Sequence, residues 1–299
     1  MKPALIIGST CVDIIINIDH LPKTAENIRP ESQTMALGGC AYNVAHMVKL
    51  LGAPFTLISP VGGGTYGDYA AKLLKADGFD IPIHIPEKEN GCCYCFVEAG
   101  GERTFMSYHG VEYTFQKEWM APYPAEEYSS VYVCGLEIEE ATGLNLIEYL
   151  EENRGPLIYF APGPRGKHIT ADRMERLYRL SPVLHLNEQE ARELGGCDSI
   201  PEAAKALNRL TGNSVIVTLG EKGAYCLEKD GTSYTVDGIP ARVVDTIGAG
   251  DSHIGTIIAC MTKGYTLKAA VEQANRVSSA VVGVKGAAIS AERLKEVLQ

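Results

Sequence analysis

The sequence predicts an α/β protein with a central, mostly parallel sheet, helices on both faces of that sheet, and a small β-sheet lid. Three observations lead to this prediction. From residue 111 onward, short apolar runs alternate with helical patterns, as in a parallel sheet whose strands are joined by helices. Between residues 81 and 110 the pattern changes to strict alternation with glycine turns, which indicates antiparallel strands. The chain has 299 residues, 45% of them hydrophobic, which is enough for a substantial core.

The composition disfavours several classes of partner. The formal net charge is -10, which argues against binding to nucleic acid or to an anionic membrane. No apolar run is long enough to cross a bilayer, and the apolar start is too short for a signal peptide. The 9 cysteines are scattered without zinc-site spacing, as expected in a reducing compartment. We therefore expect a cytoplasmic protein that acts on a small molecule and binds no nucleic acid or membrane.

The chain opens with two strands and a helix. Residues 4–8 read as a buried strand, and residues 11–18 as a second strand in which Asp13 lies among apolar neighbours. After a polar stretch, apolar residues from Val44 to Leu51 have helical spacing, with two glycines before them. An Asp in the position of Asp13 can also cap a turn, so this residue alone leaves both roles open.

The lid is predicted from two separated segments. Residues 55–61 read as a strand of the main sheet, followed by a glycine turn and a helix. Residues 12–36 and 81–110, with turns near Gly91 and Gly100, then form the lid, which is inserted into a single domain spanning residues 1–299.

The second half of the chain returns to a β-α rhythm. Residues 131–134, 157–160, 183–186 and 215–218 are the predicted strands, and helical patterns separate them. In such sheets ligands bind outside the carboxyl ends of the strands, so the polar motifs at these ends are expected to form one site.

The segment from Asp245 to Asp251, with the sequence D-T-I-G-A-G-D, is the most informative motif. We expect a strand at residues 241–244 before it and a helix over residues 254–261 after it. The unpaired amides at a helix start favour an anion, and the glycines let backbone approach a ligand. Asp251 would lie beside that anion and could accept a proton. A Gly-rich helix cap with no other role would show the same pattern.

Two motifs resemble the signatures of the ribokinase-like (PfkB) carbohydrate kinase family. The segment 245–251 is similar to the C-terminal signature, and residues 38–45, G-G-x-x-x-N-x-A, are similar to the N-terminal one. The resemblance implies a ribokinase-like fold and ATP-dependent phosphoryl transfer to a primary hydroxyl of a sugar or sugar derivative. It implies that Asp251 is the general base. The anion-hole amides would be those of Gly248, Ala249 and Gly250.

The same resemblance implies the residues that bind the acceptor. The pattern G-S-x-x-x-D ends at Asp13, and a G-x-R turn of the lid ends at Arg103. A solvated surface arginine without contact to the substrate is the alternative for Arg103. The predicted substrate-binding residues are Asp13, Gly39, Asn43, Arg103 and Glu137.

Further motifs are similar to the nucleotide and cation sites of the family. N-x-x-E at residues 187–190 implies that Glu190 acts on Mg²⁺ through water, although an N-cap with acidic residues fits the same pattern. The predicted nucleotide-binding residues are Asn187, Thr218, Gly220, Gly223 and Asn275. The resemblance also raises the hypothesis of a K⁺ site at Asp245, Ile247, Val284, Gly286 and Ser290.

The acceptor itself stays open at this stage. A nucleoside kinase of the same fold would use the same base and anion hole, and a non-catalytic sugar-binding regulator is a further alternative. A dinucleotide-dependent oxidoreductase is disfavoured because no G-x-G-x-x-G follows the first strand. His253 stands where the family commonly has Phe, so contact with a ligand and simple packing are both open. The resemblance implies a homodimer formed through the lid.

Overall fold

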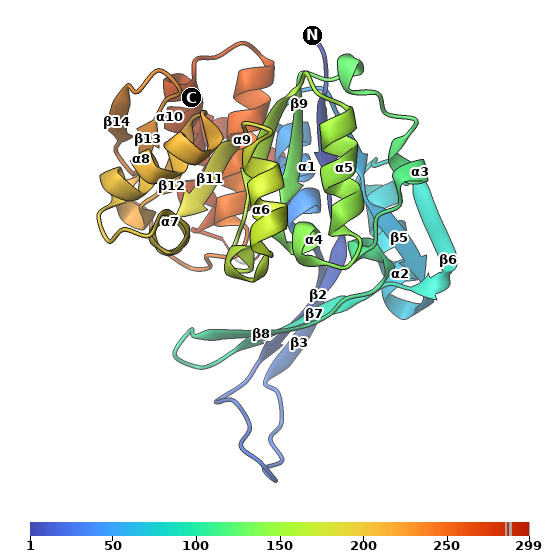
Figure 1. The fold of residues 1–299 in the computed structure, drawn as a ribbon. Coiled ribbons are helices and arrows are strands. Elements are labelled where there is room, and N and C mark those ends of the chain that lie inside the picture. Colours follow the sequence, from blue (N-terminus) through green and yellow to red (C-terminus); the bar gives the residue numbers. More distant parts are fainter. Residues whose placement is uncertain (285, 287–288, 299) are drawn as a thin grey trace.

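The computed structural model describes residues 1–284, 286 and 289–298. Its main body is built on an eight-stranded sheet (Figure 1). The strands of this sheet are β1 (Ala4–Ile7), β4 (Phe55–Ile58), β9 (Ser130–Cys134), β10 (Leu157–Ala161), β11 (Val183–Asn187), β12 (Val215–Thr218), β13 (Ala224–Leu227) and β14 (Ser233–Val236). Their order is β14-β13-β12-β11-β10-β9-β1-β4, and only the β12-β13 and β13-β14 pairs are antiparallel.

Helices cover both faces of the sheet, which confirms the predicted fold class (Figure 1). The α-helices are α1 (Cys40–Leu50), α2 (Gly64–Ala76), α3 (Lys117–Met120), α4 (Gly135–Glu139), α5 (Gly143–Glu152), α6 (Ala171–Tyr178), α7 (Glu188–Gly195), α8 (Ile200–Thr211), α9 (Ala249–Thr262), α10 (Leu267–Val281) and α11 (Ala291–Leu298). The 3-10 helices are η1 (Val111–Tyr113), η2 (Ala125–Glu127), η3 (Gly166–His168) and η4 (Gly220–Lys222). In the part of the chain that the structure describes, no helix is both long and apolar enough to span a bilayer.

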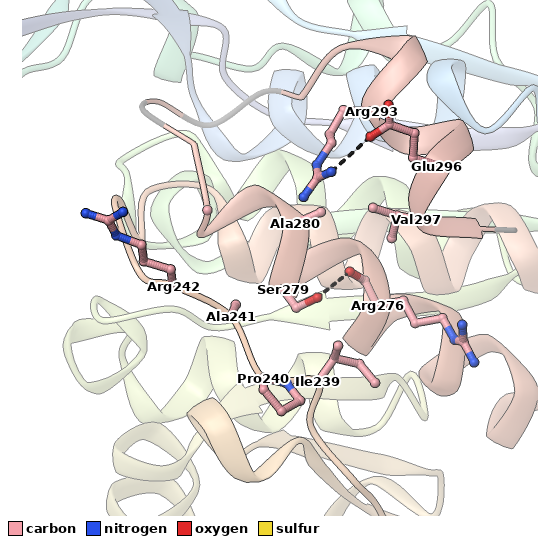
Figure 2. A pocket seen from close by; sticks show the side chains of 11 residues that line it. Ile239, Pro240, Ala241, Arg242, Arg276, Ser279, Ala280, Arg293, Glu296 and Val297 are labelled. Carbon is pink, nitrogen blue, oxygen red and sulfur yellow. Dashed lines mark hydrogen bonds and ion pairs between the residues drawn. The ribbon is translucent and has the colours of Figure 1, made fainter.

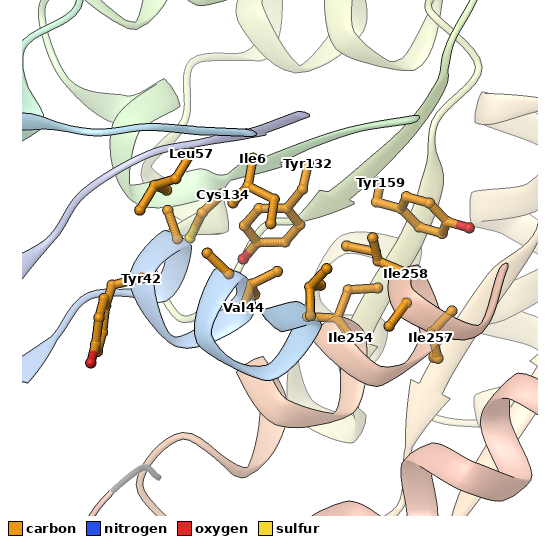
Figure 3. Packing of buried hydrophobic residues seen from close by; sticks show 14 of the residues in the cluster. Ile6, Tyr42, Val44, Leu57, Tyr132, Cys134, Tyr159, Ile254, Ile257 and Ile258 are labelled. Carbon is orange, nitrogen blue, oxygen red and sulfur yellow. The ribbon is translucent and has the colours of Figure 1, made fainter. Parts of the chain in front are cut away.

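The central strands are apolar on both sides because each face packs against a helical layer. In β1, Ala4 and Ile6 join the cluster with α1, α9 and α10, whereas Leu5 and Ile7 join the cluster with α5, α6 and α8. Figure 3 shows the first of these clusters, with Ile6 and Tyr132 of the sheet close to α1 and α9.

Helices α1 and α9 pack closely because α9 carries a glycine at their contact. A Cβ added to Gly255 would lie 3.0 Å from the Val44 carbonyl oxygen. Figure 3 shows Val44 of α1 beside Ile254 of α9. This contact joins the starts of the two helices that carry the two signature motifs.

A separate four-stranded sheet forms the lid, which projects from the main body (Figure 1). Its strands are β2 (Cys11–Asn17), β3 (Ser32–Gly38), β7 (Cys92–Val97) and β8 (Arg103–Tyr108), in the order β3-β2-β7-β8. Asp13 is paired with Cys93, and Cys93 with Ser107, in one cross-strand row. Arg103 is in a second row four residues away on β8, so it lies on the same face as Asp13, which we call the inner face.

Two predicted strands differ in the structure. Residues 55–61 do not form one strand: β4 ends at Ile58, and β5 (Pro60–Gly63) pairs with β6 (Ile83–Glu89) in a two-stranded sheet outside the lid.

The prediction of a strand at residues 241–244 was wrong, because this segment is irregular. The side chains of Val243 and Val244 are 64% and 53% exposed, so these β-branched residues do not pack in the core. The Val244 and Asp245 amides instead donate to the Val282 carbonyl oxygen, at 2.7 and 3.1 Å, which fastens the segment to the end of α10.

Candidate active site

The site lies where the carboxyl ends of the parallel strands meet the starts of α1 and α9. The connection after β1 passes Gly8 and Ser9, α4 follows β9, and α7 follows β11. Carboxyl ends of neighbouring parallel strands lie along one edge of a sheet, so these connections are brought together. The inner face of the lid lies over the same edge, as its contacts with the α9 region show.

Asp251 lies in the first turn of α9 and contacts the start of α1. Its Oδ2 accepts a hydrogen bond from Asn43 Nδ2 at 2.8 Å, although 208 residues separate them in sequence. Burial raises the pKa of Asp251, and the Asn43 donor partly offsets this by stabilising the charged form. The two signature motifs therefore meet at one carboxylate.

The predicted anion-hole segment forms the first turn of α9. Gly248 is the N-cap residue with φ 71°, a conformation that favours glycine. Ala249 donates its amide to the Thr246 carbonyl oxygen at 3.3 Å, near the long limit of a hydrogen bond. Gly250 is exposed, and a Cβ added to it would have no atom of the described residues within 4 Å. The backbone at Gly250 is thus open to a ligand from outside.

Asp13 lies on the inner face of the lid, close to Asp251. Burial, together with the negative charge of Asp251, raises the pKa of Asp13 to about 6. A Cβ on Gly38 would lie 2.0 Å from Asp13 Oδ2, so the carboxylate fits only over a glycine. Gly39 has φ 96°, and a Cβ there would lie 2.5 Å from the Ser9 carbonyl oxygen. Both glycines of the N-terminal motif are therefore required by the local packing.

Glu137 is placed beneath the connection after β1. Its carboxylate is fully buried, and Oε1 accepts the Ser9 amide at 2.8 Å. Burial raises the pKa of Glu137 despite this bond. Among the described residues, Glu137 Oε2, Ser9 Oγ and the Tyr132 hydroxyl are buried without a hydrogen-bond partner. Glu137 thus forms part of a buried polar floor below Asp13 and Gly39.

A pocket of about 600 Å³ extends from Gly250 toward the end of β12. Four of the five predicted nucleotide-binding residues line it, namely Thr218, Gly220, Gly223 and Asn275. Ala249 and Gly250 line it as well, so the pocket opens directly onto the anion-hole turn. Its size is suitable for a nucleotide-sized ligand.

A buried histidine pair supports the wall of this pocket. His185 Nε2 lies 2.9 Å from His253 Nδ1, and His253 Nε2 lies 3.0 Å from Asn275 Oδ1. Asn275 Nδ2 donates to the Val236 and Asp237 carbonyl oxygens, which fixes the amide so that Oδ1 accepts from His253. Burial lowers the pKa of His253 to about 4 and that of His185 well below its usual value, so both imidazoles are neutral at pH 7.

The sequence left open whether His253 packs in the core or contacts a ligand. In the structure it is packed, being only 2% exposed, and it also lines the pocket. His185 was not found by motif reasoning. Its only signal in the sequence is an imidazole inside the otherwise apolar run of β11.

Asn187 and Glu190 form a capping box at the start of α7. The Asn187 side chain accepts the Glu190 amide at 2.9 Å, while the Glu190 carboxylate accepts the Asn187 amide at 3.0 Å and the Asn187 side-chain amide at 2.8 Å. Neither residue is among those that line the 600 Å³ pocket. Each Glu190 oxygen receives one bond here, so lone pairs remain for a water molecule.

Arg103 and Asp245 join the lid to the anion-hole turn. Arg103 Nη1 lies 2.5 Å from Asp245 Oδ1, and the two side chains are 16% and 4% exposed. Burial would raise the pKa of Asp245, but the Gly286 and Ile247 amides and the Arg103 guanidinium outweigh it and hold that pKa below its usual value. The structure thus shows Arg103, a predicted substrate-binding residue, in a largely buried ion pair that the sequence did not reveal.

A second pocket of about 540 Å³ lies beside the first and shares Ile239, Pro240, Ala241 and Ser279 with it. Figure 2 shows its arginines: Arg242 and Arg276 point away from one another, and Arg293 pairs with Glu296. Their guanidinium groups do not converge on one position, so we assign no ligand to this pocket.

The arrangement brings four features together at one edge of the sheet. A buried carboxylate lies at a helix start, an open backbone turn adjoins it, a second carboxylate lies on a lid, and a nucleotide-sized pocket leads away. Such a site can accept a proton from a hydroxyl while it stabilises a transferring anionic group.

Comparison with known proteins gives consistent results. The family model described as "pfkB family carbohydrate kinase" matches residues 1–294. The uncharacterized sugar kinase YegV of Escherichia coli (strain K12) is 32% identical over 289 residues, covering 95% of this chain and 90% of that protein. A nucleoside kinase of Methanothermobacter thermautotrophicus is 26% identical, covering 95% of this chain and 91% of its own length.

Solved structures share the fold. The structure of Arabidopsis thaliana ribokinase complexed with ribose and ATP superposes with a TM-score of 0.84 at 20% identity, covering 100% of this chain and 99% of that one. At this level of identity the similarity is one of fold.

Proposed function

The chain belongs to the pfkB family of carbohydrate kinases, and we propose that it transfers the γ-phosphoryl group of ATP to a primary hydroxyl of a sugar or sugar derivative. The contact between Asn43 and Asp251, 2.8 Å across the two signature motifs, is the observation that carries this proposal. It positions one buried carboxylate between the lid, which would hold the acceptor, and the pocket, which would hold the nucleotide.

In the proposed reaction Asp251 is the general base. The acceptor hydroxyl gives its proton to the Asp251 carboxylate as its oxygen bonds to the γ-phosphorus, and the bond from that phosphorus to the bridging oxygen breaks to release ADP. The amides of Gly248, Ala249 and Gly250 would stabilise the charge on the transferring group, and the exposed backbone at Gly250 supports this role.

The acceptor would lie between the main body and the inner face of the lid. Asp13, with its raised pKa and its proximity to Asp251, would accept hydrogen bonds from sugar hydroxyls. Asn43 would orient both the base and the acceptor, and Gly39 would let the acceptor approach the backbone. Glu137 would bind the acceptor through its buried, unpaired Oε2 or through a water molecule.

The nucleotide would occupy the pocket that runs from Gly250 to Thr218. The adenine base would lie against Gly220, Gly223 and the fixed amide of Asn275, which line this pocket.

Mg²⁺ would be bound mainly by the phosphates and by water, with Glu190 holding one such water. Among the described residues no cluster of three ligating side chains provides a complete protein cage. When bound, Mg²⁺ neutralises charge on the phosphates. Asn187 would act by holding Glu190 in the capping box.

We expect kcat/KM for the acceptor to fall as the pH is lowered through about 6. The pKa of Asp13 is raised to about 6, so its carboxylate is charged above this pH and loses charge below it. Burial raises the pKa of Asp251 above its usual value as well. Asp13→Asn should raise KM for the acceptor and move the fall in kcat/KM to lower pH, because one titrating group and its repulsion of Asp251 are removed. Steady-state pH profiles of both proteins measure this.

The control for this prediction is Asp172→Asn, at an exposed position on α6, whose profile should match that of the wild type. A profile of Asp13→Asn with the same midpoint as the wild type would contradict the assignment of Asp13.

We further propose a homodimer formed through the lid. Met106 and Tyr108 of β8 are 56% and 58% exposed, and the strand register puts them on the face opposite Asp13. Light scattering after size exclusion should give twice the chain mass for the wild type and a monomer for Met106→Asp. Val244→Asp, which changes an equally exposed residue outside the lid, should leave the mass unchanged. A monomeric wild type would refute the proposal.

A nucleoside is the second candidate acceptor. Phe105 is 57% exposed and lies on the inner face, in the row between those of Asp13 and Arg103. An exposed ring over the acceptor position would stack on a flat base. The similarity to a nucleoside kinase supports the same reading.

A coupled ADP-release screen over pentoses, hexoses, their monophosphates and nucleosides tests both candidates. Phe105→Ala should raise KM strongly for a nucleoside and little for a free sugar. ADP release that is independent of every acceptor would contradict the proposed function.

A further inference from the structure

Three donors of the protein itself bind the carboxylate of Asp245. Its Oδ1 accepts bonds from Arg103 Nη1 at 2.5 Å and from the Ile247 amide at 2.7 Å. Its Oδ2 accepts the Gly286 amide at 2.9 Å. The side chain is 4% exposed, and these three N–H groups are its hydrogen-bond donors among the described residues.

This donor set does not fit the K⁺ site raised from the sequence. A cation bound by the Asp245 carboxylate would need its lone pairs, and the Ile247 and Gly286 amides already occupy one on each oxygen. The guanidinium of Arg103 already places a positive charge on the same oxygen and would repel a second cation.

Two further residues of the predicted K⁺ site take part in local hydrogen bonds. The Ser290 hydroxyl accepts the Arg293 amide at 3.2 Å and the Ser290 carbonyl accepts the Leu294 amide at 3.0 Å, so both oxygens serve the start of α11. Val284 donates its amide to the Val281 carbonyl oxygen at the end of α10. Lys285, Ala287 and Ala288 of the same predicted loop lie outside the described residues.

Arg103 reaches Asp245 from the lid, 142 residues away in sequence. It is the first residue of β8, in the cross-strand row with Val97, and lies on the inner face. Asp245 in turn fixes the Ile247 amide, directly before the left-handed Gly248 that starts the anion-hole turn. A charge on the lid is therefore connected to the anion hole through one carboxylate.

We infer that Arg103 takes the place of a monovalent cation in this protein, supplying from the lid the positive charge that holds Asp245 and the anion-hole turn in shape. The inference rests on the proposed kinase function for its kinetic consequence. It makes Arg103 a positioning residue, and it couples lid closure to completion of the anion hole. Its Nε is buried without a hydrogen-bond partner among the described residues.

The first test compares salts at equal ionic strength. Turnover by the wild type should be the same in KCl and in tetramethylammonium chloride. Arg103→Met, which keeps the length of the side chain and removes the charge, should lower kcat by ~10²-fold in tetramethylammonium, the cost of impairing one anion-hole element. KCl should restore part of that loss in a concentration-dependent manner, because a small cation can then approach Asp245.

The second readout does not depend on activity. The melting temperature of the wild type should be equal in the two salts, whereas that of Arg103→Met should rise with KCl concentration. Arg103→Lys, which keeps the charge, should remain insensitive to K⁺ in both assays. Arg179→Met, which removes an exposed arginine paired with Glu175 on α6, is the matched control and should respond to neither salt.

Stimulation of the wild type by K⁺ would overturn the inference. A loss in Arg103→Met that K⁺ does not reverse, by either readout, would also overturn it, since Arg103 would then act only on the acceptor or as a lid fastener. If no acceptor is phosphorylated, the proposed function fails, but the melting temperatures still decide whether Arg103 replaces a cation.

Discussion

Asp251→Asn is expected to lower kcat by ~10²–10⁴-fold, the contribution that a general base typically makes. The substitution keeps the size of the side chain and an oxygen that can accept the Asn43 bond, so the contact between α1 and α9 should persist. The amide cannot take a proton from the acceptor hydroxyl. Binding of ATP and acceptor, measured by calorimetry, should be close to that of the wild type.

The position of Asp251 makes this test specific. The carboxylate lies in the first turn of α9, beside the exposed backbone at Gly250. Asp172→Asn provides the control, because Asp172 is also in the first turn of a helix but is exposed on α6. Its turnover should equal that of the wild type. Turnover near the wild-type value for Asp251→Asn would refute the proposed mechanism.

Gly250→Val is expected to abolish most phosphoryl transfer while leaving the fold intact. Gly250 is the second residue of α9, and a Cβ there would meet no atom of the described residues within 4 Å. The backbone is not in a left-handed conformation, so Val introduces no strain of that kind. The isopropyl group would occupy the open space through which the phosphoryl group reaches the amides. We expect kcat/KM to fall by at least ~10²-fold, as when an oxyanion donor is lost.

The matched control is Lys268→Val, which puts the same side chain at the exposed second residue of α10. Both variants should melt within a few degrees of the wild type, and Lys268→Val should keep full activity. If Gly250→Val turned over substrate at the wild-type rate, the transferring group could not lie against this turn.

The sequence was sufficient for the parts of the fold that depend on local chemistry. Apolar runs such as those of β1 and β12 require burial on both faces, and this requirement places them at the centre of a sheet between helices. The glycines at positions 39 and 248 have left-handed backbone conformations, which explains why these residue types begin the two signature helices. Family membership followed from the same two motifs.

The hydrophobic pattern of the sequence gave wrong strand predictions for two segments. Residues 241–244 have the β-branched composition of a strand, but their amides bond to the end of α10 and their side chains are exposed. Residues 55–61 are continuous in pattern, yet the chain divides them between two sheets. In both cases the partner strand or helix, which is distant in sequence, decides the structure.

The sequence by itself determined the α/β class and the two signature motifs, because backbone conformation, burial and helix starts depend on neighbouring residues. Only the tertiary structure decided which charged and polar groups meet: Asn43 with Asp251, His185 with His253, and Arg103 with Asp245. Such pairs form between elements 68 to 208 residues apart. Electrostatic contacts act over a few ångströms in space, and no periodicity along the chain records which distant side chains come that close.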